Sequence, residues 1–253
     1  MDDYNPFSLC FKYDIIYEMK YINHSNYNCA ADLKTLPRLI AVAGHYGSGK
    51  TTVAVNMAMH FAQNGERAAI ADFDIVNPYF RTADARGELE RVGVHCVIPQ
   101  FANTNVDIPT LSGEIYSLFS DKNGNNPYER VIFDVGGDDG AVALSAYREH
   151  FYREPYELIY VVSMYRPMTA DPVSAASLLR EIERKSGLTA ASVVNNSSLG
   201  DETTAETVAA SEEYARRVCE LTDLPLCFTS ALDTVGYTGE NVFVMHNYTK
   251  RYF

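Results

Sequence analysis

Residues 44–51 limit what this chain can fold into more than any other segment. They read Gly-His-Tyr-Gly-Ser-Gly-Lys-Thr, and they follow a short apolar run at residues 39–43. Apolar residues at helical spacing then occupy residues 50–64. A buried strand, a glycine-rich turn and a helix in this order match the phosphate-binding loop pattern Gly-x-x-x-x-Gly-Lys-Thr. The segment therefore predicts a site for the phosphates of a nucleoside triphosphate.

Each part of this loop has a physical role. The glycines let the backbone wrap tightly and turn its N–H groups toward phosphate oxygens, and the helix start adds the positive end of its dipole. We expect Lys50 to place its ammonium on the β- and γ-phosphates, as a catalytic residue, and Thr51 to offer its hydroxyl to Mg²⁺. The expected nucleotide-binding residues of this segment are Gly44, His45, Tyr46, Gly47, Ser48, Gly49, Lys50, Thr51 and Thr52.

Short apolar runs alternate with helical patterns from Pro37 onward. The expected strands are residues 39–43, 68–71, 94–98, 131–133, 158–162, 191–194 and 226–228, and the expected helices are residues 50–64, 83–92, 109–119, 141–152, 171–186 and 203–221. Continuous apolar strands between helices indicate a parallel sheet covered on both faces. We predict a three-layer α/β P-loop NTPase fold, with a mostly parallel central sheet and ligands at the carboxyl ends of its strands.

Residues 1–36 differ from the rest of the chain because they are rich in Tyr and Asn. We expect them to form an N-terminal appendage that is poorly ordered, packed on the surface or used in association. Residues 37–253 are expected to form the nucleotide-binding domain. The apolar residues and basic pair near the C-terminus are too few and too irregular to predict a membrane-targeting helix.

Composition excludes several classes of protein. The formal net charge of −12 disfavours general attraction to nucleic acid or anionic lipid. The five cysteines are scattered without a Cys-x-x-Cys pair, which argues against a disulfide framework and favours a reducing compartment. No apolar run is long enough to span a bilayer, and the N-terminus lacks the pattern of a secretory signal. We therefore expect a cytoplasmic protein.

Acidic residues follow two of the expected strands. Asp134 ends the run at residues 131–133 and precedes Gly136 and Gly137, so it predicts a Mg²⁺-supporting acid followed by a switch loop. An ordinary strand-to-helix turn is the alternative. Asp72 and Asp74 follow the strand at residues 68–71, on the same side of the extended chain. Asp74 is expected to act on Mg²⁺ or, as a catalytic residue, on an attacking water, and Arg81 is a candidate for contact with phosphate or with a partner's carboxylate.

Together these features resemble the MinD/ParA-type ATPases of the SIMIBI class of P-loop proteins, which also includes cobyrinate-synthase-like nucleotide-binding domains. The resemblance covers about residues 38–232 and implies a slow, Mg²⁺-dependent ATPase that binds ATP or ADP and acts as a switch, often as a homodimer. It implies that Asp74 positions the water and Asp134 supports Mg²⁺. It also implies that Asn195 or Asn196, after the strand at residues 191–194, contacts the base.

The sequence departs from that family at His45, where the family carries a lysine that reaches the phosphates of a partner subunit. A neutral imidazole does not supply that charge, so the resemblance implies nucleotide binding more strongly than a nucleotide-sandwich dimer.

Other functions remain open. A small-molecule phosphotransferase would need an acceptor pocket, for which residues 101–105, Arg148 and Arg166 are candidates. A GTPase would need an Asn-Lys-x-Asp base reader, and residues 195–198 lack the lysine and the acid. A scaffold that holds a nucleotide without turnover and an unidentified protein partner are also compatible with the sequence.

Overall fold

The computed structural model describes residues 33–73, 82–98 and 113–248, without the side chains of residues 83 and 138. Most of the predicted appendage, Asp74, Arg81 and residues 101–105 lie outside the described residues. The last part of the appendage is described: a 3-10 turn, η1 (Leu33–Thr35), leads into the domain. Leu33 and Leu36 are buried in the core, so residues 33–36 pack as part of the domain.

Eight parallel strands form one sheet in the order β3-β2-β4-β1-β5-β6-β7-β8. All seven predicted strands are present, which confirms the predicted α/β fold. The strands are β1 (Leu39–Gly44), β2 (Ala68–Asp72), β3 (His95–Val97), β4 (Arg130–Asp134), β5 (Tyr156–Val162), β6 (Ser192–Asn195), β7 (Leu226–Leu232) and β8 (Val242–Met245).

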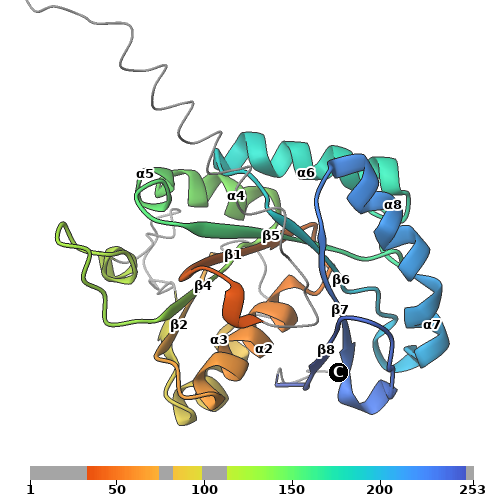
Figure 1. Ribbon diagram of the computed structural model, residues 1–253, viewed down its shortest axis with the longest axis horizontal. Coiled ribbons are helices and arrows are strands. Elements are labelled where there is room, and N and C mark those ends of the chain that lie inside the picture. The colour runs from red at the N-terminus through yellow and green to blue at the C-terminus, as the bar shows by residue number, and fades with distance from the viewer. Residues whose placement is uncertain (1–32, 74–81, 99–112, 249–253) are drawn as a thin grey trace, which may run out of the picture.

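Helices cover both faces of this sheet (Figure 1). The helices are α2 (Lys50–Gln63), α3 (Thr82–Arg91), α4 (Gly137–Ser145), α5 (Arg148–Phe151), α6 (Pro172–Ser186), α7 (Ala205–Ala210) and α8 (Glu212–Thr222). Short 3-10 turns are η2 (Gly113–Leu118), η3 (Gly200–Glu202) and η4 (Asp233–Val235). No helix among the described residues is long and apolar enough to cross a bilayer.

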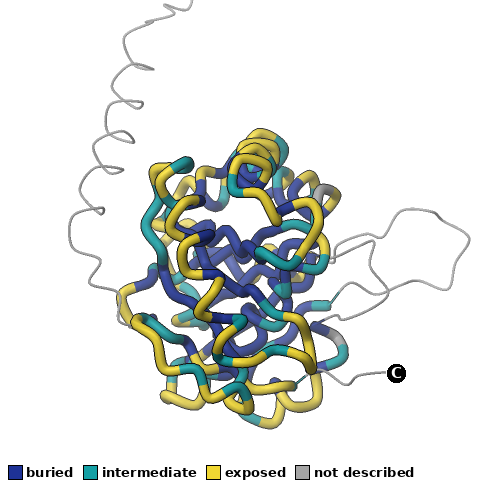
Figure 2. Tube along the Cα trace, turned by 90° about the vertical axis from the view of Figure 1, so that its right-hand side faces the viewer, coloured by how far each residue is buried: buried dark blue, intermediate teal, exposed yellow. Residues whose placement is uncertain are grey.

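The side chains of the central strands alternate between two hydrophobic cores. On β1, Leu39 and Ala41 face the core under α4, α6 and α8, whereas Ile40 and Val42 face the core under α2 and α3. All four side chains are fully buried, as a strand covered on both faces requires. Figure 2 shows the buried strands enclosed by partly exposed helices and loops.

The phosphate loop lies at the centre of the sheet. β1 lies between β4 and β5, and the chain winds outward to β2 and β3 on one side and to β6, β7 and β8 on the other. The carboxyl end of β1 is therefore the point where the winding changes direction, and open α/β sheets bind ligands at such a point.

Two predicted helices are each divided in the structure. The helix expected at residues 203–221 is split into α7 and α8 at Ser211, whose hydroxyl donates to the Val208 carbonyl (2.7 Å) and accepts from the amide of Asn195 (2.8 Å). Such side-chain bonds compete with the regular helix. The helix expected at residues 141–152 starts earlier, at Gly137, and is split into α4 and α5 around Tyr147, which packs between aromatic rings. The described part of the helix expected at residues 109–119 is the 3-10 turn η2.

Strand β8 is not predicted by the sequence. Only its alternate residues Phe243 and Met245 are buried, while Val244 is half exposed, because β8 lies at the sheet edge. The end of β8 is held by Asn56 of α2, which donates to the His246 carbonyl (3.0 Å) and accepts from the His246 amide (2.7 Å). This strand places a further wall beside the phosphate loop.

Candidate nucleotide-binding site

The phosphate loop connects β1 to α2 by a turn that only glycine permits at two positions. Gly49 has a φ of 79°, and a Cβ placed on it would lie 2.1 Å from the Asn196 amide nitrogen. A Cβ on Gly44 would lie 2.5 Å from the Val161 carbonyl oxygen of β5. The loop is thus fitted closely between β5 and the segment after β6.

Lys50 and Thr51 occupy the first turn of α2. They are 4% and 7% exposed, and both line the cavity beside the loop. Among the described residues, neither a carboxylate nor a carbonyl accepts a hydrogen bond from the Lys50 ammonium. A buried cation at a helix start favours an anion there, because the unpaired N–H groups of the first turn also point outward.

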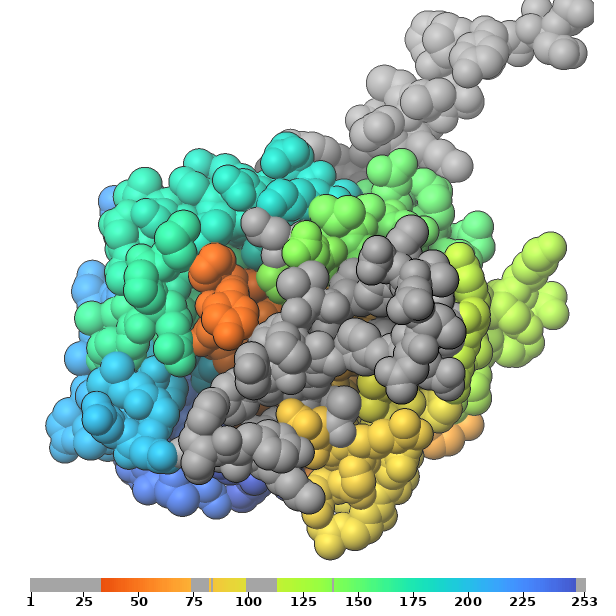
Figure 3. All heavy atoms as spheres, turned by 180° about the vertical axis from the view of Figure 1, so that it is seen from behind, coloured from red at the N-terminus to blue at the C-terminus, as the bar shows by residue number. Residues whose placement is uncertain are grey.

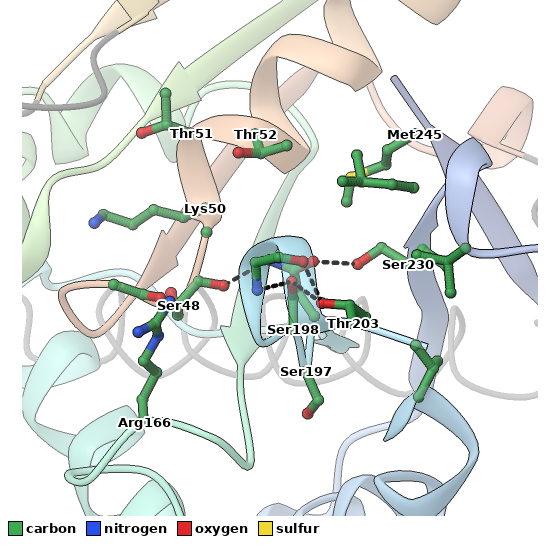
Figure 4. Close-up of a pocket in the computed structure, with 18 of the residues that line it drawn as sticks. Ser48, Lys50, Thr51, Thr52, Arg166, Ser197, Ser198, Thr203, Ser230 and Met245 are labelled. Atoms are coloured by element: carbon green, nitrogen blue, oxygen red, sulfur yellow. Dashed lines mark hydrogen bonds between the residues drawn. The ribbon is translucent and has the colours of Figure 1, made fainter. Parts of the chain in front are cut away.

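A cavity of about 530 Å³ extends from this loop to the strands beyond β5. Figure 4 shows Lys50, Thr51 and Thr52 on the helix side of this cavity, with Ser230 and Met245 on the opposite side. The wall includes Tyr46, Gly47, Ser48, Gly49, Lys50, Thr51, Thr52, Arg166, Asn196, Ser197, Ser198, Gly200, Asp201, Thr203, Val208, Ser230, Ala231, Leu232, Val235, Met245 and Asn247. Polar phosphate-loop groups at one end and a mixed apolar and polar wall at the other suit a molecule with both kinds of surface.

The two asparagines predicted to contact the base have different surroundings. Asn196 lines the cavity, donates to the Ser48 carbonyl (2.7 Å) and accepts from the Ser230 hydroxyl (2.7 Å). Asn195 is fully buried behind it, where its side chain bonds to Ser211 and Ser197 and does not line the cavity. Asn196 therefore braces the phosphate loop, and Asn195 holds the packing behind it.

The first two residues of the loop, Gly44 and His45, lie outside the cavity wall. Gly44 packs against β5, and the His45 carbonyl accepts from the Ser48 amide (3.1 Å) in a tight turn. Tyr46 lies at the mouth and is 59% exposed. Figure 3 shows that part of the orange segment, which contains the loop, reaches the surface beside teal residues that follow β5.

Asp134 and Asp72 end adjacent strands and lie side by side in the register of β2 and β4. Phe133 faces the core under α4 and α6, so alternation directs Asp134 to the other face, which α2 covers. Asp134 is fully buried and accepts from the Thr82 hydroxyl (2.9 Å) at the start of α3. Thr51 and these carboxylates offer oxygen ligands on one face of the sheet, and this donor set fits Mg²⁺. Asp74 lies outside the described residues.

The predicted switch glycines lie where α4 begins. Gly136 caps the helix and Gly137 is its first residue. The Asp134 carbonyl accepts from the Phe73 amide (2.8 Å), and a Cβ on Gly140 would lie 2.9 Å from the Phe73 carbonyl. The start of α4 and Phe73, the residue that follows β2, are thus in direct contact.

Sequence reasoning missed much of the cavity wall. Asp201, Leu232 and Met245 are far from the loop in sequence and carry no motif of their own. Arg166 was expected in an acceptor pocket with Arg148, but Arg166 lies at the carboxyl ends of the strands and Arg148 lies at their amino ends. Arg166 follows β5 and lines the cavity, whereas Arg148 packs against Gly187, ahead of β6.

The comparisons with known proteins agree with this geometry at the level of the fold. No protein-family model matches the sequence, and the search of curated proteins gives no match. Among solved structures, the chain is similar to FtsY from Mycoplasma mycoides, with 16% identity and a TM-score of 0.52 over 83% of this chain and 66% of that one. It is also similar to the signal recognition particle 54 kDa protein from Aeropyrum pernix K1 in complex with GDP, with 17% identity and a TM-score of 0.51.

The second match covers 91% of this chain and 48% of that protein, so the chain spans less than two thirds of either neighbour. Both neighbours belong to the SIMIBI class of P-loop NTPases, and the likeness confirms the predicted fold. The finer resemblance to MinD/ParA-type ATPases is not part of this finding and stays a prediction. The chain therefore has a mostly parallel α/β fold like that of these P-loop NTPases, with a phosphate loop that opens into a cavity.

Proposed function

We propose that this protein is a nucleotide-dependent switch that binds a purine nucleoside triphosphate with Mg²⁺ and hydrolyses it slowly. The observation that carries the proposal is the continuity of the cavity from the Lys50 end of the phosphate loop to the wall formed by Asn196, Ser230 and Met245. A triphosphate on the loop would extend its sugar and base toward that wall. The apolar side chains there would cover the faces of the base, and the hydroxyls and amides would meet its edge.

GTP is the nucleotide that the comparisons favour. One neighbour was solved with GDP, and no Asn-Lys-x-Asp motif is needed if another acid reads the base. Asp201 brings a carboxylate into the cavity wall, and a carboxylate accepts hydrogen bonds from the adjacent N–H groups of guanine. ATP is the second candidate, because the resemblance to MinD/ParA-type ATPases supports it. In either case Lys50, Thr51 and Asp134 keep the same roles.

The switch would act through the contacts of the third phosphate. The segments after β2 and β4 bond to each other through Phe73 and Asp134, so a ligand that orders one would order the other. Loss of the third phosphate on hydrolysis would release both. A homodimer or another protein partner would read this difference, with Asp74 as the proposed residue that positions the attacking water.

Hydrolysis by purified protein tests the proposal. Phosphate release from GTP and from ATP would be measured with Mg²⁺ for the parent chain, Lys50→Ala, Asp74→Ala and the control Lys122→Ala. Lys122 is an exposed lysine on a distant turn. We expect slow release by the parent and the control, and loss of release in the other two variants. Equal turnover by all four proteins would rule out this site as the source of the activity.

A further inference from the structure

Arg166 reaches the phosphate loop from a different part of the fold. It lies in the loop between β5 and α6, and its Nε donates to the Gly47 carbonyl at 2.7 Å. A Cβ placed on Gly47 would lie 3.4 Å from the same nitrogen. Figure 4 shows the side chain extending from this loop toward Ser48, on the opposite side of the phosphate loop from Thr51 and Thr52. The guanidinium therefore lies at the cavity wall next to the turn that would hold the phosphates.

The backbone that carries Arg166 is held at several points. The Thr169 hydroxyl donates to the Ser163 carbonyl (2.7 Å) and closes the loop on itself. The Met164 amide donates to the Ser197 hydroxyl (2.9 Å), and the Tyr165 hydroxyl donates to the Thr207 carbonyl of α7 (2.7 Å). Because these contacts fix the start of the side chain, less conformational entropy is lost when its guanidinium binds a ligand.

The charge of Arg166 is not neutralised within the described part of the chain. Arg38 and Arg130 each form an ion pair with a glutamate, whereas Arg166 pairs with no described carboxylate. Its Nε is used by Gly47, but the two Nη groups have no acceptor among the described residues. A guanidinium offers its donors in a planar fork that matches the oxygens of a phosphate. A guanidinium with no described carboxylate partner in this position favours an anionic ligand.

We propose that Arg166 binds the terminal phosphate of the bound nucleoside triphosphate and so distinguishes the triphosphate from the diphosphate. This inference rests on the proposed function. Lys50 approaches the phosphates from the start of α2, and Arg166 approaches from the loop after β5, so the two cations lie on different sides of the phosphate loop. Arg166 thus brings a second cation to this site from the same chain. The loop that carries Arg166 also bonds to Ser197 and α7, so binding of the third phosphate by Arg166 would be coupled to the position of these segments.

Binding titrations with matched nucleotides test this role. GTPγS and GDP, and ATPγS and ADP, would be titrated with Mg²⁺ into the parent chain, Arg166→Ala, Arg166→Gln, Arg166→Lys and the control Arg148→Ala. We expect the Ala and Gln variants to bind the triphosphate analogue about tenfold more weakly, while diphosphate affinity changes by less than about twofold. Arg166→Lys would lie between them and the parent, because it keeps the charge but loses the fork. Arg148→Ala would bind as the parent does.

The Gln variant separates charge from loop bracing, because its amide can still donate to the Gly47 carbonyl. Parent-like triphosphate affinity in Arg166→Gln or in Arg166→Ala would overturn the inference, and so would an equal loss for both nucleotides. Arg166 is exposed, so the variants should keep the melting temperature of the parent, which would be checked first. If the parent itself binds none of the four nucleotides, the proposed function fails and this inference with it. If the parent binds and the Arg166 variants bind equally well, only the inference fails.

Discussion

Glu157 provides a quantitative test of the packing beneath the site. It is the second residue of β5, near the amino end of the strand and away from the phosphate loop, and only 4% of it is exposed. Within the described residues, the one hydrogen bond to its carboxylate comes from the Ser192 hydroxyl of β6 (2.7 Å). Burial raises the pKa of Glu157 from 4.5 to about 7, and the Ser192 hydrogen bond offsets a smaller part of the shift. Between about pH 4.5 and pH 7, the folded protein therefore keeps a proton that the unfolded chain has largely lost.

The pKa difference sets the size of the effect on stability. The carboxyl of the unfolded chain releases its proton near pH 4.5, and that of the folded chain near pH 7. Between these values the native state binds more protons, so the free energy of unfolding falls as the pH rises, by up to about 1.4 kcal/mol per pH unit. A difference of about 2.5 pKa units corresponds to roughly 3 kcal/mol in total. Below pH 4.5 there is no loss, and above pH 7 the loss is complete.

Glu157→Gln removes this titration while keeping the shape of the side chain and an acceptor for Ser192. Urea unfolding at pH 4.5, 6, 7 and 8 would give the free energy of unfolding of the parent and the variant. We expect the variant to gain stability relative to the parent as the pH rises, with most of the roughly 3 kcal/mol present by pH 8. A difference that stays constant across this range would refute the assignment of a raised pKa to Glu157.

Glu154→Gln is a control of opposite sign. Burial opposes ionisation of Glu154, but hydrogen bonds from Arg38 and Ser120 outweigh it and hold its pKa below the ordinary value. The ionised carboxylate therefore stabilises the fold at neutral pH, and that contribution is lost as the pH falls through the folded pKa. At neutral pH, Glu154→Gln should therefore be less stable than the parent, whereas Glu157→Gln should be more stable. Both differences should shrink toward acid pH, and that of Glu157→Gln should vanish near pH 4.5.

Three further variants address the site. Gly49→Ala should lower both the melting temperature and the nucleotide affinity, because it adds a clash with Asn196 to the cost of about 1 kcal/mol for positive φ. The control Gly65→Ala has a similar φ with open space around it and should show the backbone cost alone, so equal losses of stability in the two variants would contradict the close fit at Gly49. Asp201→Asn should weaken GTP relative to ATP in competition titrations, and an unchanged ratio would exclude Asp201 as the base reader. Asp134→Asn should remove the gain in nucleotide affinity on adding Mg²⁺ while leaving affinity in EDTA intact, and a full Mg²⁺ response would exclude a metal role for it.

Local patterns predicted the centre of this fold well. The central strands are apolar along their whole length because both faces are covered, so runs such as residues 131–133 and 158–162 are recognisable without context. The phosphate loop is likewise local, since its glycines, Lys50 and Thr51 are contiguous. The contact between the loop and Asn196 is not local, and the position of Asn196 after a strand predicted a contact with the base and not with the loop.

Features that depend on contacts between distant segments were not predictable. β8 has two buried residues of four and owes its place to pairing with β7 and to Asn56 of α2. The break at Ser211 depends on a hydrogen bond from Asn195 of β6. The sequence predicts Arg166 as a candidate for an acceptor pocket, and only the fold brings it to Gly47. Much of the cavity wall has this origin, because the chain after β6, the end of β7 and the end of β8 contribute lining residues that are far from the phosphate loop in sequence.

The central claim is that the phosphate loop and its cavity bind a nucleoside triphosphate. Isothermal titration of GTPγS, and then of ATPγS, into the parent chain and Lys50→Ala with Mg²⁺ tests it most directly. The account predicts saturable binding of one nucleotide per chain by the parent, weakened roughly 100-fold in Lys50→Ala, whose melting temperature should match the parent's. No binding of either nucleotide by the parent, or equal binding by both proteins, would contradict it.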